Sequence, residues 1–212
     1  MSYQIKEVFY SIQGEGAHTG RPAIFCRFSQ CNLWSGREED RETATCKFCD
    51  TDFIGTDGQN GGRFKNADSL AKHLMKFWPQ GNNLPQPFVI LTGGEPLLQV
   101  DQTLIDTLHN YQFEIALETN GTKIPPNNID WICVSPKAGA PWFLKHGDEL
   151  KLVFPQAGLM PDQIDIQGFN HYYLQPMDNE DQLTNQQKAI DYCLAHPHWK
   201  LSLQTHKILN ID

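Results

Sequence analysis

The sequence of 212 residues lacks any long apolar segment, and on the sequence alone this excludes a membrane-spanning helix. It also lacks an excess of basic residues: 17 Lys and Arg stand against 25 Asp and Glu, which gives a net charge of -8. Nucleic-acid binding usually needs a basic surface, so we expect no direct nucleic-acid partner. The N-terminal residues have no basic start followed by an apolar stretch and a cleavage site, and we expect a cytoplasmic protein.

The sequence contains six cysteines, and disulfides are disfavoured in a reducing compartment. Cys26, Cys133 and Cys193 lie among apolar neighbours, where cysteine usually behaves as a small buried hydrophobic residue. The other three lie in the polar stretch SQCNLWSGREEDRETATCKFCDT, where burial does not account for them. That stretch therefore indicates metal or redox chemistry.

The cysteines of this stretch, Cys31, Cys46 and Cys49, leave three kinds of site open. A structural zinc site normally has four ligands, so it would need His18 or His73 as the fourth. A thioredoxin-like CxxC pair would use only the last two cysteines. An iron–sulfur cluster would use all three thiolates.

Short apolar runs recur along the chain, and each ends in polar or glycine-rich residues. They are AIFCRF (23–28), FVIL (88–91), EIALE (114–118), WICV (131–134), KLVF (151–154), HYYL (171–174) and the closing LSLQTHK (201–207). Nearly continuous apolar runs are typical of parallel strands that are covered on both faces. Polar residues at the carboxyl ends of such strands are typical of the functional rim of a β/α barrel.

Helical periodicity is found in three segments. Residues 68–78 and 96–111 each gather large apolar residues on one face: Leu70, Leu74, Phe77 and Trp78 in the first, and Leu97, Leu104, Ile105, Leu108 and Tyr111 in the second. A capping box of Thr184 and Gln187 is expected to open a third helix, with Ile190, Cys193 and Leu194 facing inward.

The link between the runs 114–118 and 131–134 is short and contains Pro125 and Pro126, which leaves no room for a helical crossover. We therefore expect an α/β fold: an incomplete, irregular β/α barrel of the partial TIM type, with about six parallel strands and few helices. One domain is expected to span residues 1–212.

The segment TGGEP, residues 92–96, follows a predicted strand. Its two glycines would allow close backbone approach to a ligand, and the carboxylate of Glu95 could hold an ammonium group. Together with the three-cysteine loop, TGGEP resembles the radical S-adenosylmethionine enzymes. The resemblance implies a four-iron, four-sulfur cluster on Cys31, Cys46 and Cys49, whose open iron binds S-adenosylmethionine. The cofactors would then supply a 5′-deoxyadenosyl radical that abstracts a substrate hydrogen.

The spacing of the cysteines departs from the common C-x3-C-x2-C pattern of that superfamily and reads C-x14-C-x2-C. Because loop-closure entropy grows only logarithmically, the longer loop costs roughly 1.4 kcal/mol. The inserted residues 32–45 are mostly polar, and we expect them to face solvent, with Trp34 as their only large apolar anchor.

Further motifs between residues 8 and 208 narrow the resemblance: EVFYSIQGEGAHTGRPAIFCRFSQCNLW, CDT, TGGEP, ETNGT, SPK, QPMD and LSLQTHK. Together they resemble the 7-carboxy-7-deazaguanine synthases of the queuosine precursor pathway, some of which carry a long insert between the first two cluster cysteines. The implied activity is that of a carbon–nitrogen lyase. It converts 6-carboxy-5,6,7,8-tetrahydropterin into 7-carboxy-7-deazaguanine and ammonia by a radical ring contraction, and S-adenosylmethionine is regenerated.

The resemblance also implies residue roles. The pterin would be bound by the SIQGEG loop and by polar residues at strand ends: Ile12, Gln13, Gly14, Glu15, Arg27, Thr92, Glu118 and His206. Arg27 would hold the substrate carboxylate, unless it forms a structural ion pair instead. S-adenosylmethionine would be bound by Phe48, Cys49, Gly93, Gly94, Ser135, Pro136, Lys137, Gln175, Pro176, Met177 and Asp178. Thr51 would be a magnesium ligand, unless it merely stabilises a turn.

Two other functions stay open on the sequence. A radical activase that places a glycyl radical on a protein would share the three cysteines and TGGEP, but it would not need SIQGEG, Arg27 and CDT together. A non-enzymatic zinc-binding interaction module would leave the polar motifs at the strand ends unexplained. For the synthase, the resemblance implies a homodimer that receives electrons from an external donor such as a flavodoxin.

Overall fold

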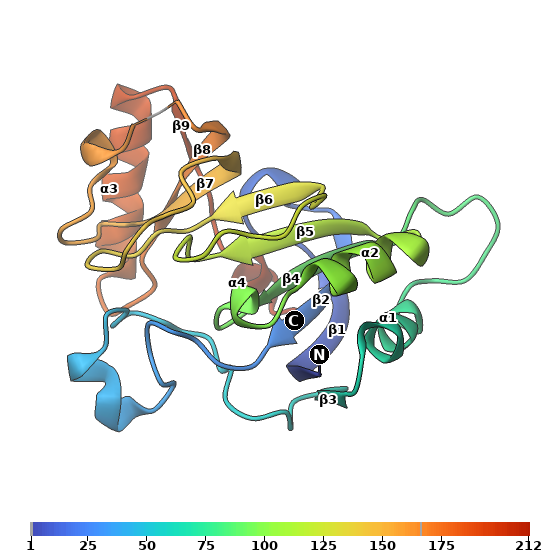
Figure 1. Cartoon of the computed structure of the whole chain (residues 1–212). Coiled ribbons are helices and arrows are strands. Elements are labelled where there is room, and N and C mark those ends of the chain that lie inside the picture. Colours follow the sequence, from blue (N-terminus) through green and yellow to red (C-terminus); the bar gives the residue numbers. More distant parts are fainter. Residues whose placement is uncertain (1, 166) are drawn as a thin grey trace.

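The computed structural model describes residues 2–165 and 167–212, and its centre is a mixed β-sheet (Figure 1). In the described residues the sheet has nine strands in the order β3-β1-β2-β4-β5-β6-β7-β8-β9. Their bounds are β1 (Tyr3–Ile12), β2 (Pro22–Phe28), β3 (Gly62–Phe64), β4 (Phe88–Gly93), β5 (Glu114–Thr119), β6 (Trp131–Val134), β7 (Gly147–Phe154), β8 (Phe169–Pro176) and β9 (Trp199–Leu201). β2 and the strands from β4 to β9 run parallel, which confirms the partial barrel predicted from the apolar runs.

The two strands that the apolar runs did not indicate, β1 and β3, are antiparallel. β1 pairs with β2 on one side and with the short β3 on the other. The pairing places Glu7 directly opposite Arg27. β1 therefore closes one end of the parallel sheet and carries the SIQGEG loop at its own carboxyl end.

Four α-helices and four short 3-10 helices are found in the described residues. The α-helices are α1 (Ala67–Met75), α2 (Gln102–Asn110), α3 (Gln182–Ala195) and α4 (Thr205–Leu209), and the 3-10 helices are η1 (Gly16–His18), η2 (Glu38–Thr43), η3 (Pro96–Leu98) and η4 (Pro161–Gln163). α2 packs on β5, and α3 packs on β8 and β9 at the other end of the sheet. α4 lies behind the strands in the view of Figure 1, near the C-terminus.

The single helix predicted over residues 96–111 is wrong in its extent. The segment divides into η3 and α2, because Asp101 caps α2: its carboxylate accepts hydrogen bonds from the backbone N–H of Leu104 at 2.9 Å and from the hydroxyl of Tyr3 at 2.8 Å. The apolar face is as predicted, since Leu104, Ile105 and Leu108 are buried. α1 ends at Met75, so the prediction that Phe77 and Trp78 belong to this helix is wrong, and both lie just beyond its end.

The predicted inward face of α3 is wrong for Ile190 and Leu194, whereas Cys193 packs against the second apolar cluster as predicted. The helix begins at Gln182 rather than at a capping box of Thr184 and Gln187, and Ile190 and Leu194 are 36% and 78% exposed. Asn185 faces inward instead, because its Nδ2 donates to the carbonyl oxygen of Met177 at 3.0 Å and to Oδ1 of Asn179 at 2.9 Å. Ala189, one turn later, is buried beneath it, while Cys193 is half-buried.

The closing run 201–207 is a strand only at its first residue, since β9 ends at Leu201 and α4 begins at Thr205. As predicted, the link of residues 120–130 between β5 and β6 holds no helix in the described part of the chain. None of the helices described is long and apolar enough to cross a membrane.

The core consists of two apolar clusters. One joins β1, β2, β4 and β5 to α1 and α2, and the other joins the strands from β6 to β9 to α3. These clusters fix the strands whose carboxyl ends carry the predicted site residues.

Candidate functional site

A cavity of about 420 Å³ opens where the strand ends, the cysteine loop and α4 meet. Almost all residues predicted from the sequence line it: Ile12, Gln13, Gly14, Glu15, Arg27, Cys31, Cys46, Phe48, Cys49, Thr51, Thr92, Gly93, Gly94, Glu118, Ser135, Lys137, Gln175, Pro176, Met177, Asp178 and His206. Only Pro136 is outside the lining, because it is buried while its neighbours Ser135 and Lys137 take the cavity side. The volume is that of a small-molecule site.

The three cysteines of the loop present their thiols to this cavity. The backbone N–H of Leu33 donates to Sγ of Cys31 at 3.4 Å. The interaction between the thiols of Cys46 and Cys49 lowers the pKa of Cys49 to about 6 and raises the pKa of Cys46. A thiolate is the form that binds metal, so the donor set fits an iron–sulfur cluster, whose properties also depend on hydrogen bonds to sulfur.

The remaining cysteines are apart from the cavity lining, as predicted. Cys26 and Cys133 are buried on β2 and β6, where burial raises the pKa of both thiols. The histidines considered as zinc ligands are elsewhere: His18 packs on Trp131, and His73 bonds the carbonyl oxygen of Asn60. Among the described residues, no three His, Cys, Asp or Glu side chains are grouped to hold a single metal ion.

The insert of residues 32–45 is anchored at both of its ends. Trp34 is 7% exposed, packs edge-on against Phe53 and lies under the guanidinium of Arg41. Leu33 is equally buried, so the prediction that Trp34 is the only apolar anchor is wrong. Arg41 Nη1 also donates to the carbonyl oxygen of Cys49 at 3.1 Å, which ties the exposed 3-10 helix η2 to the cysteine loop.

The glycines of TGGEP are required because neighbouring backbone lies too close to them for a side chain to fit. A Cβ on Gly94 would collide with the carbonyl oxygen of Gln30, directly before the first cysteine of the loop. Glu95 does not face the cavity: it is fully buried and accepts hydrogen bonds from Thr119 Oγ1 and from the backbone N–H groups of Leu97 and Asn120. The expectation that its carboxylate holds a ligand's ammonium group is therefore wrong.

The SIQGEG loop packs against α4. A Cβ on Gly14 would lie 2.8 Å from the backbone nitrogen of His206, so only glycine fits there. The backbone N–H of Thr205 donates to the carbonyl oxygen of Gly14 at 3.0 Å. These contacts bring His206 to the cavity beside Gln13 and Glu15.

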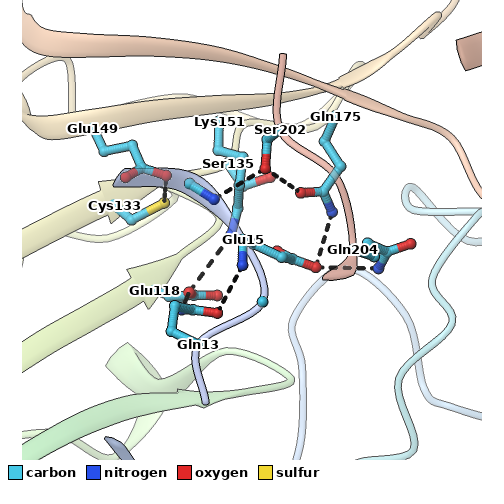
Figure 2. A network of polar contacts seen from close by, with 12 residues as sticks. Gln13, Glu15, Glu118, Cys133, Ser135, Glu149, Lys151, Gln175, Ser202 and Gln204 are labelled. Carbon is cyan, nitrogen blue, oxygen red and sulfur yellow. Dashed lines mark hydrogen bonds and ion pairs between the residues drawn. The ribbon is translucent and has the colours of Figure 1, made fainter. Parts of the chain in front are cut away.

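The two glutamates at the floor of the cavity belong to one polar network (Figure 2). Gln13 Nε2 donates to Oε1 of Glu118 at 2.9 Å, and Gln175 and Gln204 donate to Oε1 of Glu15 at 3.0 and 3.1 Å. The ammonium of Lys151 lies 2.6 Å from Oε2 of Glu15. Burial alone would raise the pKa of Glu15, but the charge of Lys151 lowers it below its usual value.

Arg27 forms the structural ion pair considered as an alternative and still lines the cavity. Its Nε donates to Oε1 of Glu7 at 2.7 Å, across the β1–β2 pair. In the described residues its two terminal nitrogens make no hydrogen bond. They therefore stay available for a ligand carboxylate.

Lys207 forms two further ion pairs among the residues that line the cavity near Thr51. Lys207 of α4 contacts Asp50, 2.5 Å away, and Asp178, which follows β8. Within residues 2–165 and 167–212 the hydroxyl of Thr51 forms no hydrogen bond, so the turn-stabilising alternative has no support.

Some lining residues were missed by the sequence reasoning: Lys6, Glu7, Asp50, Asp52, Asn120, Lys151, Gln204, Lys207 and Asp212. Asp50 lies in the motif CDT and Gln204 in LSLQTHK, but the sequence alone indicates no role for either side chain. Lys151 opens an apolar run, and a lysine in a buried strand is a signal that carboxylates lie near it.

No protein-family model matches the chain, but full-length relatives do. It is 57% identical over 211 residues to the 7-carboxy-7-deazaguanine synthase of Bradyrhizobium diazoefficiens and 55% identical to that of Burkholderia multivorans, with all of each chain covered. It superposes on the crystal structure of QueE from Escherichia coli with a TM-score of 0.67 and 25% identity, covering 96% of this chain and 94% of the other. The chain belongs to the 7-carboxy-7-deazaguanine synthase family.

Proposed function

We propose that this chain is a radical S-adenosylmethionine enzyme that converts 6-carboxy-5,6,7,8-tetrahydropterin into 7-carboxy-7-deazaguanine and ammonia, a step towards queuosine. The observation that carries the proposal is the convergence of the three-cysteine loop and the SIQGEG loop on one cavity. The name shared by the full-length relatives supports the same reaction.

Cys31, Cys46 and Cys49 would hold a four-iron, four-sulfur cluster, since their thiols face one cavity and Cys49 is readily ionised. When bound, the cluster and S-adenosylmethionine supply the radical that removes a hydrogen atom from the substrate. Lys137 would add positive charge beside the sulfurs and the cofactor, and its Nζ is fixed by Ser135 through the carbonyl oxygen at 2.6 Å and Oγ at 2.7 Å.

The proposed S-adenosylmethionine site lies along the strand ends next to the cysteine loop. Backbone of Gly93 and Gly94 borders the cavity, and Phe48 and Met177 give it apolar surface. Asp178, paired with Lys207, would complete this side of the cavity.

The pterin would lie between Arg27 on β2 and Glu118 on β5. The terminal nitrogens of Arg27 suit the 6-carboxylate, because a guanidinium binds a carboxylate through two parallel hydrogen bonds. The carboxylate of Glu118 suits the N–H edge of the pterin ring, because an ionised carboxylate is an acceptor only. Binding the pterin at both its 6-carboxylate and its N–H edge would orient the reacting carbon, and such positioning is the main contribution of the protein to this chemistry.

Further parts of the proposal concern species that act with the enzyme. Thr51 would bind Mg²⁺ beside the substrate, with the remaining ligands supplied by water and substrate oxygens. An external donor such as a flavodoxin would supply electrons in the cytoplasm. Two chains would form a homodimer, each folded as one domain with the insert at residues 32–45.

The test is turnover by anaerobically reconstituted holoenzyme with a reductant, S-adenosylmethionine and the tetrahydropterin. We expect 7-carboxy-7-deazaguanine and ammonia, and deuterium placed at C6 of the substrate should appear in recovered S-adenosylmethionine. Product without that transfer would contradict regeneration of the cofactor. No product from a verified holoenzyme would favour a glycyl-radical activase.

A further inference from the structure

Lys151 lies in the middle of the carboxylates at the cavity floor, and nothing in the sequence motifs assigns it a role. It is on β7, and only 6% of its side chain is exposed. Its Nζ lies 2.6 Å from Oε2 of Glu15 and 3.5 Å from Oε1 of Glu118. A buried ammonium is strongly unfavourable without such partners, so Lys151 depends on its contacts with the two glutamates to be charged at this position.

Acidic groups outnumber basic groups around this lysine. The titratable groups that interact with Lys151 or with its partner Glu15 are Glu15, Glu118, Cys133, Glu149, Lys137 and His206. Glu149 has other partners, because its Oε2 accepts from the backbone N–H of Ala17 at 2.9 Å, and burial raises its pKa. In the described residues, Lys151 is the only cation in ion-pair contact with Glu15 or Glu118 (Figure 2).

The two glutamates use their oxygens differently. Both carboxylate oxygens of Glu15 accept hydrogen bonds, Oε2 from Lys151 and Oε1 from Gln175 and Gln204. Oε1 of Glu118 accepts a hydrogen bond from Gln13 and is the oxygen nearest to the ammonium of Lys151. Within the part of the chain that the structure describes, no side chain or backbone group donates to Oε2 of Glu118, and this residue lines the cavity. That oxygen is therefore open to a ligand.

We propose that Lys151 is a positioning residue that holds the carboxylates of Glu118 and Glu15 in place, so that Oε2 of Glu118 accepts a hydrogen bond from the N–H edge of the pterin. This inference rests on the proposed pterin substrate. It assigns the lysine a part in substrate recognition without contact between the lysine and the reacting atoms.

The charges at the site agree with this role. Burial lowers the pKa of Lys151, but the charges of Glu118 and Glu15 raise it well above its usual value. Burial raises the pKa of Glu15, and Lys151 more than reverses that effect. Without the lysine the pKa of Glu15 should rise, and Glu15 should take up a proton. Substrate binding should then weaken as the pH falls and recover as the pH rises through the raised pKa.

The test compares Lys151→Met with Lys200→Met, a matched control in which the lysine is exposed on β9. Binding of the tetrahydropterin to the unreduced holoenzyme with S-adenosylmethionine is measured by calorimetry across pH, in buffers that differ in ionisation enthalpy. For Lys151→Met we expect Kd to rise by about 10- to 100-fold at neutral pH, with a proton released on binding. The control should match the wild type.

Lys151→Arg keeps the charge and covers the case in which Lys151→Met does not fold. We expect its Kd to be as independent of pH as that of the wild type. A Kd for Lys151→Met that is unchanged, or raised equally at every pH without proton release, would overturn the proposal. A pH-dependent Kd for Lys151→Arg would also overturn it. A wild type that does not bind the pterin would instead refute the proposed function.

Discussion

The carboxylate of Glu95 accepts a hydrogen bond of 2.8 Å from the backbone N–H of Asn120. The same carboxylate accepts from Thr119 Oγ1 at 2.8 Å and from the backbone N–H of Leu97 at 3.0 Å. One buried side chain thus ties the end of β4 to the end of β5, where TGGEP and ETNGT border the cavity.

Glu95→Gln should destabilise the protein while changing almost no volume. The amide nitrogen of glutamine is a donor, so at least one of the three buried donors would lose its acceptor, at a cost of about 1–3 kcal/mol. Urea unfolding measures the loss, and Glu180→Gln, an exposed residue before α3, is the matched control. Equal stability of the two variants would show that the three hydrogen bonds contribute little.

Much of the fold could be predicted because apolar runs report burial directly. The six runs from residue 23 to residue 174 are all strands, and their polar ends meet at one cavity. β1 was missed as a strand because YQIKEVFYSI mixes apolar and charged residues without a continuous run. Its antiparallel pairing depends on the turn through η1, which strand patterns do not specify.

The candidate site could be predicted as far as motifs mark residues that approach a ligand. Pairings between distant residues could not: Lys151 and Glu15 are 136 positions apart, and only the tertiary structure brings them together. Asn185 shows the same limit in α3, because its hydrogen bonds to Met177 and Asn179 decide which face is inward. Apolar periodicity alone would turn Ile190 and Leu194 inward, but both are exposed.

Cys46→Ala should lose the intact cluster, because removal of one thiolate leaves a second iron without its protein ligand. Reconstituted wild type should contain about four irons and four sulfides per chain. Cys193→Ala, a half-buried thiol on α3 outside the cavity lining, is the control and should keep its iron. Iron and sulfide analysis with optical absorption makes the comparison, and full iron in Cys46→Ala would exclude it as a ligand.

Arg27→Lys should weaken binding of the substrate carboxylate. A lysine ammonium cannot keep the bond to Glu7 and also offer two parallel donors to a carboxylate, so KM should rise about 10- to 100-fold with a smaller change in kcat. Competition by a pterin that lacks the 6-carboxylate provides the control, since its inhibition constant should be the same for both enzymes. A variant that weakens both ligands equally would indicate that Arg27 only supports the β1–β2 pair.

Thr51→Ala tests the proposed magnesium ligand. Thr51 lines the cavity two positions after the last cysteine of the loop, and no hydrogen bond from the described residues occupies its hydroxyl. Magnesium prefers octahedral oxygen coordination and usually keeps several waters, so one hydroxyl is a sufficient protein contribution beside substrate oxygens. Its role would be to orient the pterin rather than to carry electrons.

The alanine variant should therefore keep its iron and its affinity for S-adenosylmethionine, but turn over more slowly and respond less to added magnesium. Thr45→Ala, in the insert and outside the cavity lining, removes a similar hydroxyl and should respond as the wild type does. The initial rate of each variant is measured as magnesium is added back after chelation, and the two responses are compared. If chelation leaves the wild-type rate unchanged, or if Thr51→Ala keeps the wild-type magnesium response, then Thr51 is not a metal ligand and its hydroxyl serves the substrate or the loop directly.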